Sequence, residues 1–183
     1  MIKNKKGTYL SFAVMLVVSA LLTPAYANRG ANPIGSVNAT IDGRPYEGKT
    51  LEIPSAGTAT VEFQSMGSTT LISLQAHDPQ AKKAMHNVLS IEMTVTGEGP
   101  SAAIVPGAVA WWPNGMRGAF YINEGKEADT RIQITALSLD GGGQVEGHFA
   151  ATLCRKDSMF AAADPNECIP IEGSFETRLG EAG

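Results

Sequence analysis

Apolar and polar residues alternate with a period of two through much of the chain, and this alternation constrains the fold more than any other feature. The alternating runs lie at 36–41, 58–63, 89–96 and 131–139. Such one-sided alternation predicts antiparallel strands that have one face on the core and the other in solvent. Glycine, proline, asparagine and aspartate gather between the runs, as turns require. Asp42-Gly43 in particular is a strong signal for a tight hairpin.

One segment departs from this pattern. Asp78 and Pro79 offer a capping side chain followed by a proline suited to a first helical turn. Residues 80–87 include alanine, lysine, methionine and histidine and contain no β-branched residue, so we expect a short helix there. The sequence therefore predicts a mainly β protein with eight or nine short strands. Its expected architecture is a single antiparallel β-sandwich or flattened barrel with one short helix.

A strand-like motif occurs twice near the C-terminus. Val145-Glu146-Gly147-His148-Phe149 returns as Ile171-Glu172-Gly173-Ser174-Phe175, and each copy continues the alternation to a leucine. Two similar strands joined by one loop are most simply an antiparallel hairpin. The glycines are expected where another backbone or a large ring crosses, or where a bulge forms.

The two cysteines of the chain, Cys154 and Cys168, lie between the copies of this motif. In an exported chain they predict one disulfide that ties the ends of the connecting loop. A redox-active pair is the alternative, but the spacing is far from C-x-x-C and no thioredoxin-like pattern surrounds it. We therefore expect a structural bond.

The N-terminus has the pattern of a secretory signal peptide. Lys3, Lys5 and Lys6 precede an uncharged apolar run at 9–22, and small residues at 25–27 suit a signal peptidase. We expect cleavage after Ala27, which leaves residues 28–183 as a single soluble β-domain in the periplasm or outside the cell. An uncleaved membrane anchor is the alternative.

The charge of the chain bears on its partners. The formal net charge is −4, and it becomes −7 without residues 1–27, because they hold three lysines and no acidic residue. An acidic chain with scattered positive charges argues against nucleic acid and against anionic membrane surfaces as partners. We also expect no membrane insertion after signal cleavage.

Three stretches together resemble an uncharacterised family of small exported bacterial β-domains. They are VNATIDGRPYEG, RIQITALSLDGGGQVEGHFAATL and IEGSFETRL. The family pattern is a first strand of the form A-x-I-D-G-x-x-Y/W, many short strands and a closing G-x-F hairpin. Many members look like lipoproteins, whereas this chain has no lipobox cysteine. The resemblance implies a fold and export but no activity, cofactor or site residue.

The sequence contains no recognisable motif for catalysis and no regular spacing of metal ligands. There is no G-x-S-x-G, no nucleophile with an identifiable base and no phosphate-binding loop. His77, His86 and His148 lack metal-ligand spacing, so we expect no metal and no cofactor. Met85-His86 and the other methionines leave a copper-type site as an alternative, because thioether and imidazole ligands favour soft ions.

Trp111 and Trp112 are the best candidates for recognition. Adjacent residues of a strand face opposite ways, so one ring is expected to be exposed if the strand continues through both. Arg117 follows the turn at 113–115, and exposed tryptophan with arginine is typical of a binding hot spot. A ring that merely covers a sheet edge is the alternative.

These observations favour a non-catalytic binding or accessory domain of the bacterial cell envelope, with a protein or glycan partner. The alternative function is a periplasmic metal-handling protein of the copper type or a small hydrolase.

Overall fold

The computed structural model describes residues 30–97, 99–139 and 142–181, and the predicted signal peptide lies outside them. Within these residues the chain forms twelve strands and two short 3-10 turns. They are β1 (Asn32–Ile41), β2 (Arg44–Ile53), β3 (Thr58–Ala59), β4 (Val61–Met66), β5 (Thr69–His77), β6 (Val88–Thr96), η1 (Gly99–Ser101), β7 (Ala103–Trp112), β8 (Phe120–Ile122), η2 (Glu127–Asp129), β9 (Arg131–Ser138), β10 (Gln144–Lys156), β11 (Asp164–Arg178) and β12 (Gly180–Glu181).

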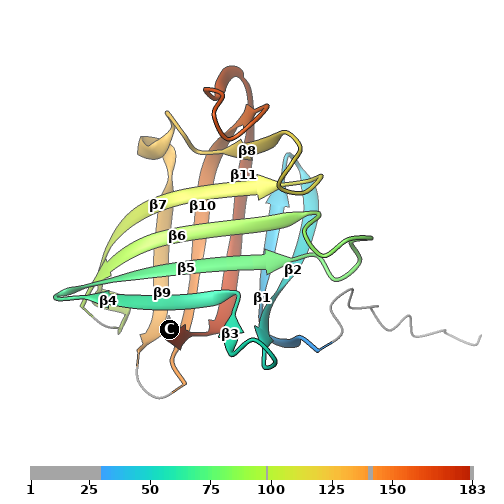
Figure 1. The fold of residues 1–183 in the computed structure, drawn as a ribbon. Helices are drawn as coiled ribbons and strands as arrows, with labels where there is room; N and C mark the ends of the chain where they lie inside the picture. The colour runs from blue at the N-terminus through green and yellow to red at the C-terminus, as the bar shows by residue number, and fades with distance from the viewer. Residues whose placement is uncertain (1–29, 98, 140–141, 182–183) are drawn as a thin grey trace, which may run out of the picture.

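All twelve strands belong to one sheet that folds back on itself. Its order runs from β4 through β5, β6, β7 and β8 to β10, β11, β1 and β2, and the pair Lys49 and His77 joins β2 back to β5. β9 pairs with β10 outside this path, and among the described residues the one parallel pairing is the short β12–β4 contact. Figure 1 shows β4–β7 crossing over the layer that contains β9, β10, β11 and β1. The prediction of a mainly β, antiparallel sandwich or flattened barrel is confirmed.

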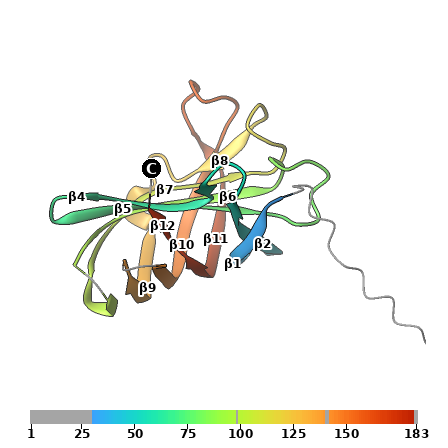
Figure 2. The same cartoon turned by 60° about the horizontal axis from the view of Figure 1, so that its bottom comes forward.

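The core lies between these two layers (Figure 2). It is built by the inward members of the alternating runs, as the period of two requires. The most completely buried large side chains include Ile72, Leu74, Leu89, Ile91 and Met93 from β5 and β6. They pack in one cluster with Val37, Phe149, Leu153, Ile171 and Phe175 from β1, β10 and β11.

The repeated motif forms the predicted hairpin. β10 and β11 pair in antiparallel register from Gln144 opposite Arg178 to Cys154 opposite Cys168. The inward side chains of β10 are buried, at residues 145, 147, 149, 151 and 153. His148 on β10 and Glu172 and Glu176 on β11 are exposed to solvent. The hairpin also carries β9 and β1 on its two sides, so it is the centre of its layer.

The predicted helix at 80–87 is wrong. The segment consists of turns and bends, and the backbone hydrogen bonds within it run from Ala81 to Asp78 and from His86 to Lys83. Asp78 does cap the chain locally, accepting the backbone N–H of Gln80 at 2.7 Å, but its other oxygen accepts the Asn87 side-chain amide at 2.8 Å. This second bond draws the two ends of the segment together, and so short a stretch cannot offset the cost of helix nucleation. Among the described residues no helix is long and apolar enough to cross a bilayer.

Candidate interaction site

The loop between β10 and β11 projects from the body of the molecule (Figure 1). Figure 1 shows it rising beyond the sheet at the end opposite the C-terminus. The regular ladder reaches Cys154 and Cys168, after which the register shifts and Arg155 pairs with Asp164. Residues 157–163 therefore form the loop, and Pro165, Asn166 and Glu167 bulge out of β11 just below it.

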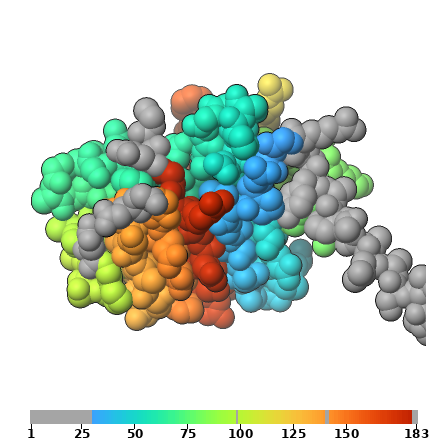
Figure 3. Space-filling model, turned by 90° about the horizontal axis from the view of Figure 1, so that it is seen from below, coloured from blue at the N-terminus to red at the C-terminus, as the bar shows by residue number. Residues whose placement is uncertain are grey.

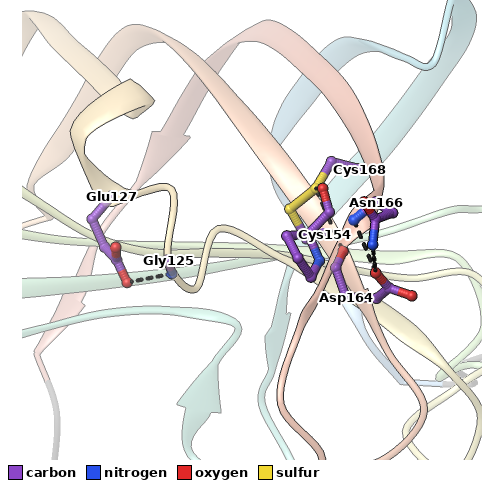
Figure 4. Close-up of a disulfide and its surroundings, with 7 residues drawn as sticks. Gly125, Glu127, Cys154, Asp164, Asn166 and Cys168 are labelled. Carbon is purple, nitrogen blue, oxygen red and sulfur yellow. Dashed lines mark hydrogen bonds between the residues drawn. A yellow bond between two sulfur atoms is a disulfide. The ribbon is translucent and has the colours of Figure 1, made fainter.

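A disulfide closes the neck of this loop. Cys154 and Cys168 are bonded to each other, as predicted, and they are directly opposite residues of the two strands. Figure 4 shows the bond beside a turn in which the Asp164 carboxylate accepts the backbone N–H of Asn166 at 2.9 Å. Such a side-chain turn fixes the bulge locally. The covalent bond and the turn together limit the conformations that the loop can adopt.

Arg155 makes two ion pairs at the neck, and the one with Glu167 crosses it. Its guanidinium lies 2.8 Å from Asp157 at the start of the loop and 2.8 Å from Glu167 on the returning strand. The hydrogen bond with Glu167, followed by the charge of Asp157, raises the pKa of Arg155 above its ordinary value. Exposed ion pairs contribute little to stability, so their effect is mainly to orient the two sides of the loop.

The base of the loop is held by a contact with the segment that follows β8. Lys156 is buried, and its ammonium pairs with the carboxylate of Glu124 in the segment that follows β8. In the same segment the carboxylate of Glu127 accepts the backbone N–H of Gly125 at 2.9 Å (Figure 4). Backbone N–H groups, first its own and then that of Gly125, lower the pKa of Glu127. The residues at the base of the loop are therefore fixed by an ion pair to a segment that has its own internal hydrogen bond.

The tip of the loop is apolar and lies in solvent. The Phe160 side chain is fully exposed, at 101%, and Met159 beside it is also exposed. Three alanines follow at 161–163. A single exposed apolar residue is ordinary, but large aromatic side chains usually bury most of their 150–250 Å². Two neighbouring large apolar side chains held away from the body on a clamped loop can fill a pocket on a partner.

The tryptophans are arranged differently from expectation. Trp111 and Trp112 face opposite ways, as predicted, but neither ring is fully exposed. Trp112 is only 9% exposed and stacks on Phe120, with ring centroids 4.1 Å apart. Trp111 is half-buried against the main core, stacks on Tyr121 and donates its indole N–H to the Asn87 side chain at 2.7 Å. The sequence predicted one exposed ring, whereas Trp111 is half-buried and Trp112 is buried.

The reason is that loops cover this end of the sheet. Asn87, at the end of the 78–87 segment, donates its backbone N–H to the carbonyl of Pro113 at 3.2 Å. The two loops thus meet beside Val88 and Trp112, which form a small second cluster with Ala110 and Phe120. Arg117 is exposed in the turn after Trp112. Because the two rings lie on opposite faces, they do not form one patch with Arg117.

A buried hydroxyl network lies near Trp111. The Tyr46 hydroxyl is 2.8 Å from the carbonyl oxygen of Ala76 and 3.2 Å from that of Asn87. Burial, and to a lesser degree the charge of Asp78, raises the pKa of Tyr46 above its ordinary value. These bonds connect β2, β5 and the end of the 78–87 segment, and their role is structural.

A second candidate surface is the outer face of β9, β10, β11 and β1. Figure 3 shows these strands side by side as orange, red and blue bands. One row across them is Gln133, His148, Ser174 and Asn38, each directly opposite the next. These polar residues border a shallow hollow of about 920 Å³. Hydroxyl, amide and imidazole groups in a row can hydrogen-bond a polar ligand such as a glycan.

Metal ligands of the common types do not converge on these surfaces. Among the described residues, no three or more His, Cys, Asp or Glu side chains form a group that could hold a metal ion.

Comparison with known proteins yields no matching family model, curated protein or solved structure. The resemblance to small exported β-domains therefore stays a prediction.

Sequence reasoning missed the loop tip. At this tip the chain forms a turn closed by the hydrogen bond from the backbone N–H of Ala161 to the carbonyl of Ser158. The available signal was the pair Met159-Phe160 between the two cysteines. Two large apolar residues in a loop with no alternation have no strand face on which to be buried.

Proposed function

We propose that the chain is an exported, non-catalytic binding or accessory domain of the bacterial cell envelope, and that it binds a protein partner through the β10–β11 loop. In this proposal the signal peptide is removed and residues 28–183 act as a soluble domain in the periplasm or outside the cell. A disulfide supports export, because such bonds persist in oxidising compartments and are rare in the cytosol.

The observation that carries the proposal is the full exposure of Phe160 on a loop with a covalently closed neck. Aromatic side chains that enter a partner's pocket supply much of the energy of protein interfaces. A loop already ordered before binding loses less conformational entropy on association, so more of that energy appears as affinity. Exposure and constraint together are what a binding loop requires.

Trp111, Trp112 and Arg117 stay a predicted partner-binding group, but they are the less favoured one. Most of the Trp112 ring is already in contact with the protein, and Trp111 has its indole N–H bonded to Asn87. Phe160 has all of its surface still to bury. A glycan partner would instead suit the polar outer face of the β9–β1 layer.

The proposal is tested by comparing two exposed apolar positions. Val105 on β7 is 66% exposed and serves as the matched control for Phe160. Immobilised wild type, Phe160→Ser and Val105→Ser are incubated with envelope extract, and each retained protein is quantified. We expect one partner to be lost with Phe160→Ser and kept with Val105→Ser, with unchanged melting temperatures. Equal retention of that partner by all three proteins would refute the loop as the binding site. A fourth protein with both Trp111→Phe and Arg117→Ala tests the tryptophan group, and loss of the partner in that variant alone would place the site there.

A further inference from the structure

The hollow on the outer face of β9, β10, β11 and β1 crosses all four strands, which lie side by side in Figure 3. Its lining consists of three consecutive rows of directly opposite residues, with Pro106 of β7 beyond them. The rows are Gln133, His148, Ser174 and Asn38, then Ile132, Phe149, Gly173 and Ala39, and then Arg131, Ala150, Glu172 and Thr40. Because neighbouring strands are about 4.8 Å apart, the hollow extends over about 14 Å from β9 to β1. We call it the cross-strand trough.

The first and third rows form the walls of the trough, and the middle row forms its floor. Side chains alternate along a strand, so those of the middle row point into the core and leave their backbone at the surface. Phe149 in this row is only 3% exposed. In the walls, directly opposite residues have Cβ atoms about 5 Å apart, so each wall is a continuous line of side chains. Ala150, the one small residue of the walls, opens space between Arg131 and Glu172.

Hydrogen bonds to a ligand in the trough must come from the wall side chains. The backbone groups of β10, β11 and β1 are used in ladders on both sides of each strand. The wall offers amides, an imidazole and hydroxyl groups, which can both donate and accept. A ligand hydroxyl group is also a donor and an acceptor at once. Such a wall therefore suits a ligand that is rich in hydroxyl groups.

The charges in the trough favour an uncharged ligand. Arg131 and Glu172 cancel each other there, although the chain as a whole is acidic. The ion pairs found among the described residues are made by Arg155 and Lys156, so the Arg131 donors and the Glu172 acceptors stay available. An ion of either sign would lie close to a charge of its own sign, which is unfavourable. A neutral hydroxyl group can bond to both residues.

We propose that the cross-strand trough binds an uncharged oligosaccharide whose sugar units follow one another across the strands. One sugar ring covers only part of a trough of about 14 Å, so affinity should rise with the number of units. A peptide is less suited, because peptides join a sheet through free backbone groups at an edge. The site lies on the outer face of the hairpin rather than on its loop, and it does not depend on the proposed protein partner.

The test uses residues 28–183 with the disulfide intact and two neutral probes, glucose oligomers of the cellulose type and N-acetylglucosamine oligomers, each from one to four units. The aromatic ring among the lining residues, Phe149, is buried and cannot stack on a sugar. Recognition then rests on hydrogen bonds of modest net strength, so NMR titration is the suitable measurement. We expect shifts of the side-chain amides of Asn38 and Gln133 and of the backbone amides along the three rows. Affinity for at least one series should rise with each added unit.

Blocking the trough gives the second readout. Ala150→Tyr places a large side chain between Arg131 and Glu172 and should weaken binding of the tetramer by about tenfold or more. Gln75→Tyr, at an exposed position on β5 in the other layer, is the matched control and should leave binding unchanged. Phe160→Ser should also leave it unchanged, which separates this site from the loop. Melting temperatures confirm that each variant is folded.

Three results would overturn the proposal. They are no shift along the rows with either neutral series, affinity that does not depend on oligomer length, and equal binding by Ala150→Tyr and wild type. Tetragalacturonic acid, an anionic tetramer, tests the charge argument. Binding of this acid alone, with neither neutral tetramer bound, would contradict an uncharged ligand.

Discussion

Phe175 of β11 lies directly opposite Gly147 of β10, and Phe149 of β10 lies directly opposite Gly173 of β11. Each phenylalanine therefore has the glycine of the other motif copy as its cross-strand neighbour. A Cβ atom at Gly147 would come within 2.7 Å of Cζ of Phe175. The two rings can then pack together in the core, with centroids 6.4 Å apart. At Gly173 a Cβ atom would instead come within 2.8 Å of Cβ of Ala39 on β1, so each copy of the motif has its glycine where a neighbouring strand or ring approaches closely.

Gly147→Ala should destabilise the domain. The added methyl group would also lie 2.3 Å from the carbonyl oxygen of Gln133, so the backbone of β9 or β10 must move. We expect a loss of about 1–3 kcal/mol in the free energy of unfolding, as for other overpacked core positions. Urea unfolding measures it, with Ser174→Ala on the outward face as the control. Equal stability of the two variants would disprove the tight contact.

Removing the disulfide should lower stability without unfolding the domain. Cys154 and Cys168 are separated by 14 positions, and closing a loop of this size contributes about 3 kcal/mol. We expect the Cys154→Ala, Cys168→Ala variant to unfold at a correspondingly lower urea concentration. It should still bind its partner measurably, but more weakly. Free thiols in the native exported protein, or lost binding at full stability, would contradict a structural bond.

The two tryptophans should respond differently to truncation. Trp112→Ala should cost about 3–5 kcal/mol, since it removes a buried ring stacked on Phe120. Trp111→Phe should cost about 1 kcal/mol, because it removes the hydrogen bond to Asn87 and keeps most of the packing. Iodide quenching of the single-tryptophan variants should show Trp112 as the more shielded ring. The reverse order of quenching would mean that the loops do not cover Trp112.

Stability should fall in alkaline solution through Tyr46. Burial raises the pKa of this phenol above its ordinary value of about 10. A group whose pKa is higher in the folded state stabilises the fold below its unfolded pKa, and this contribution is lost as the pH rises beyond it. We expect the free energy of unfolding to decline above about pH 10, and to decline less in Tyr46→Phe. Identical pH profiles for both proteins would contradict this account.

The local features of the fold could be predicted from the sequence because they depend on neighbouring residues. Asp42 and Gly43 have φ values of 50° and 74°, as the tight turn between β1 and β2 requires. The inward residues of β10 and β11 follow from alternation, and the bond between Cys154 and Cys168 follows from their position between the two copies.

Features that depend on distant parts of the chain could not be predicted. The contact between Lys49 and His77 that joins β2 to β5 depends on how two layers meet, which the period of each strand does not determine. The covering of Trp112 depends on the packing of two loops that are far apart in sequence. The exposure of Phe160 depends on where the register of β10 and β11 ends.

A photo-crosslinking amino acid at position 160 in living cells tests the binding loop most directly. The same group at position 105, which is also exposed and apolar, is the control. We predict one adduct of defined mass from position 160 and none from position 105. Excess wild-type domain should suppress this adduct, whereas excess Phe160→Ser should not. No adduct from position 160, or the same adduct from both positions, would contradict the proposal that the loop docks a partner.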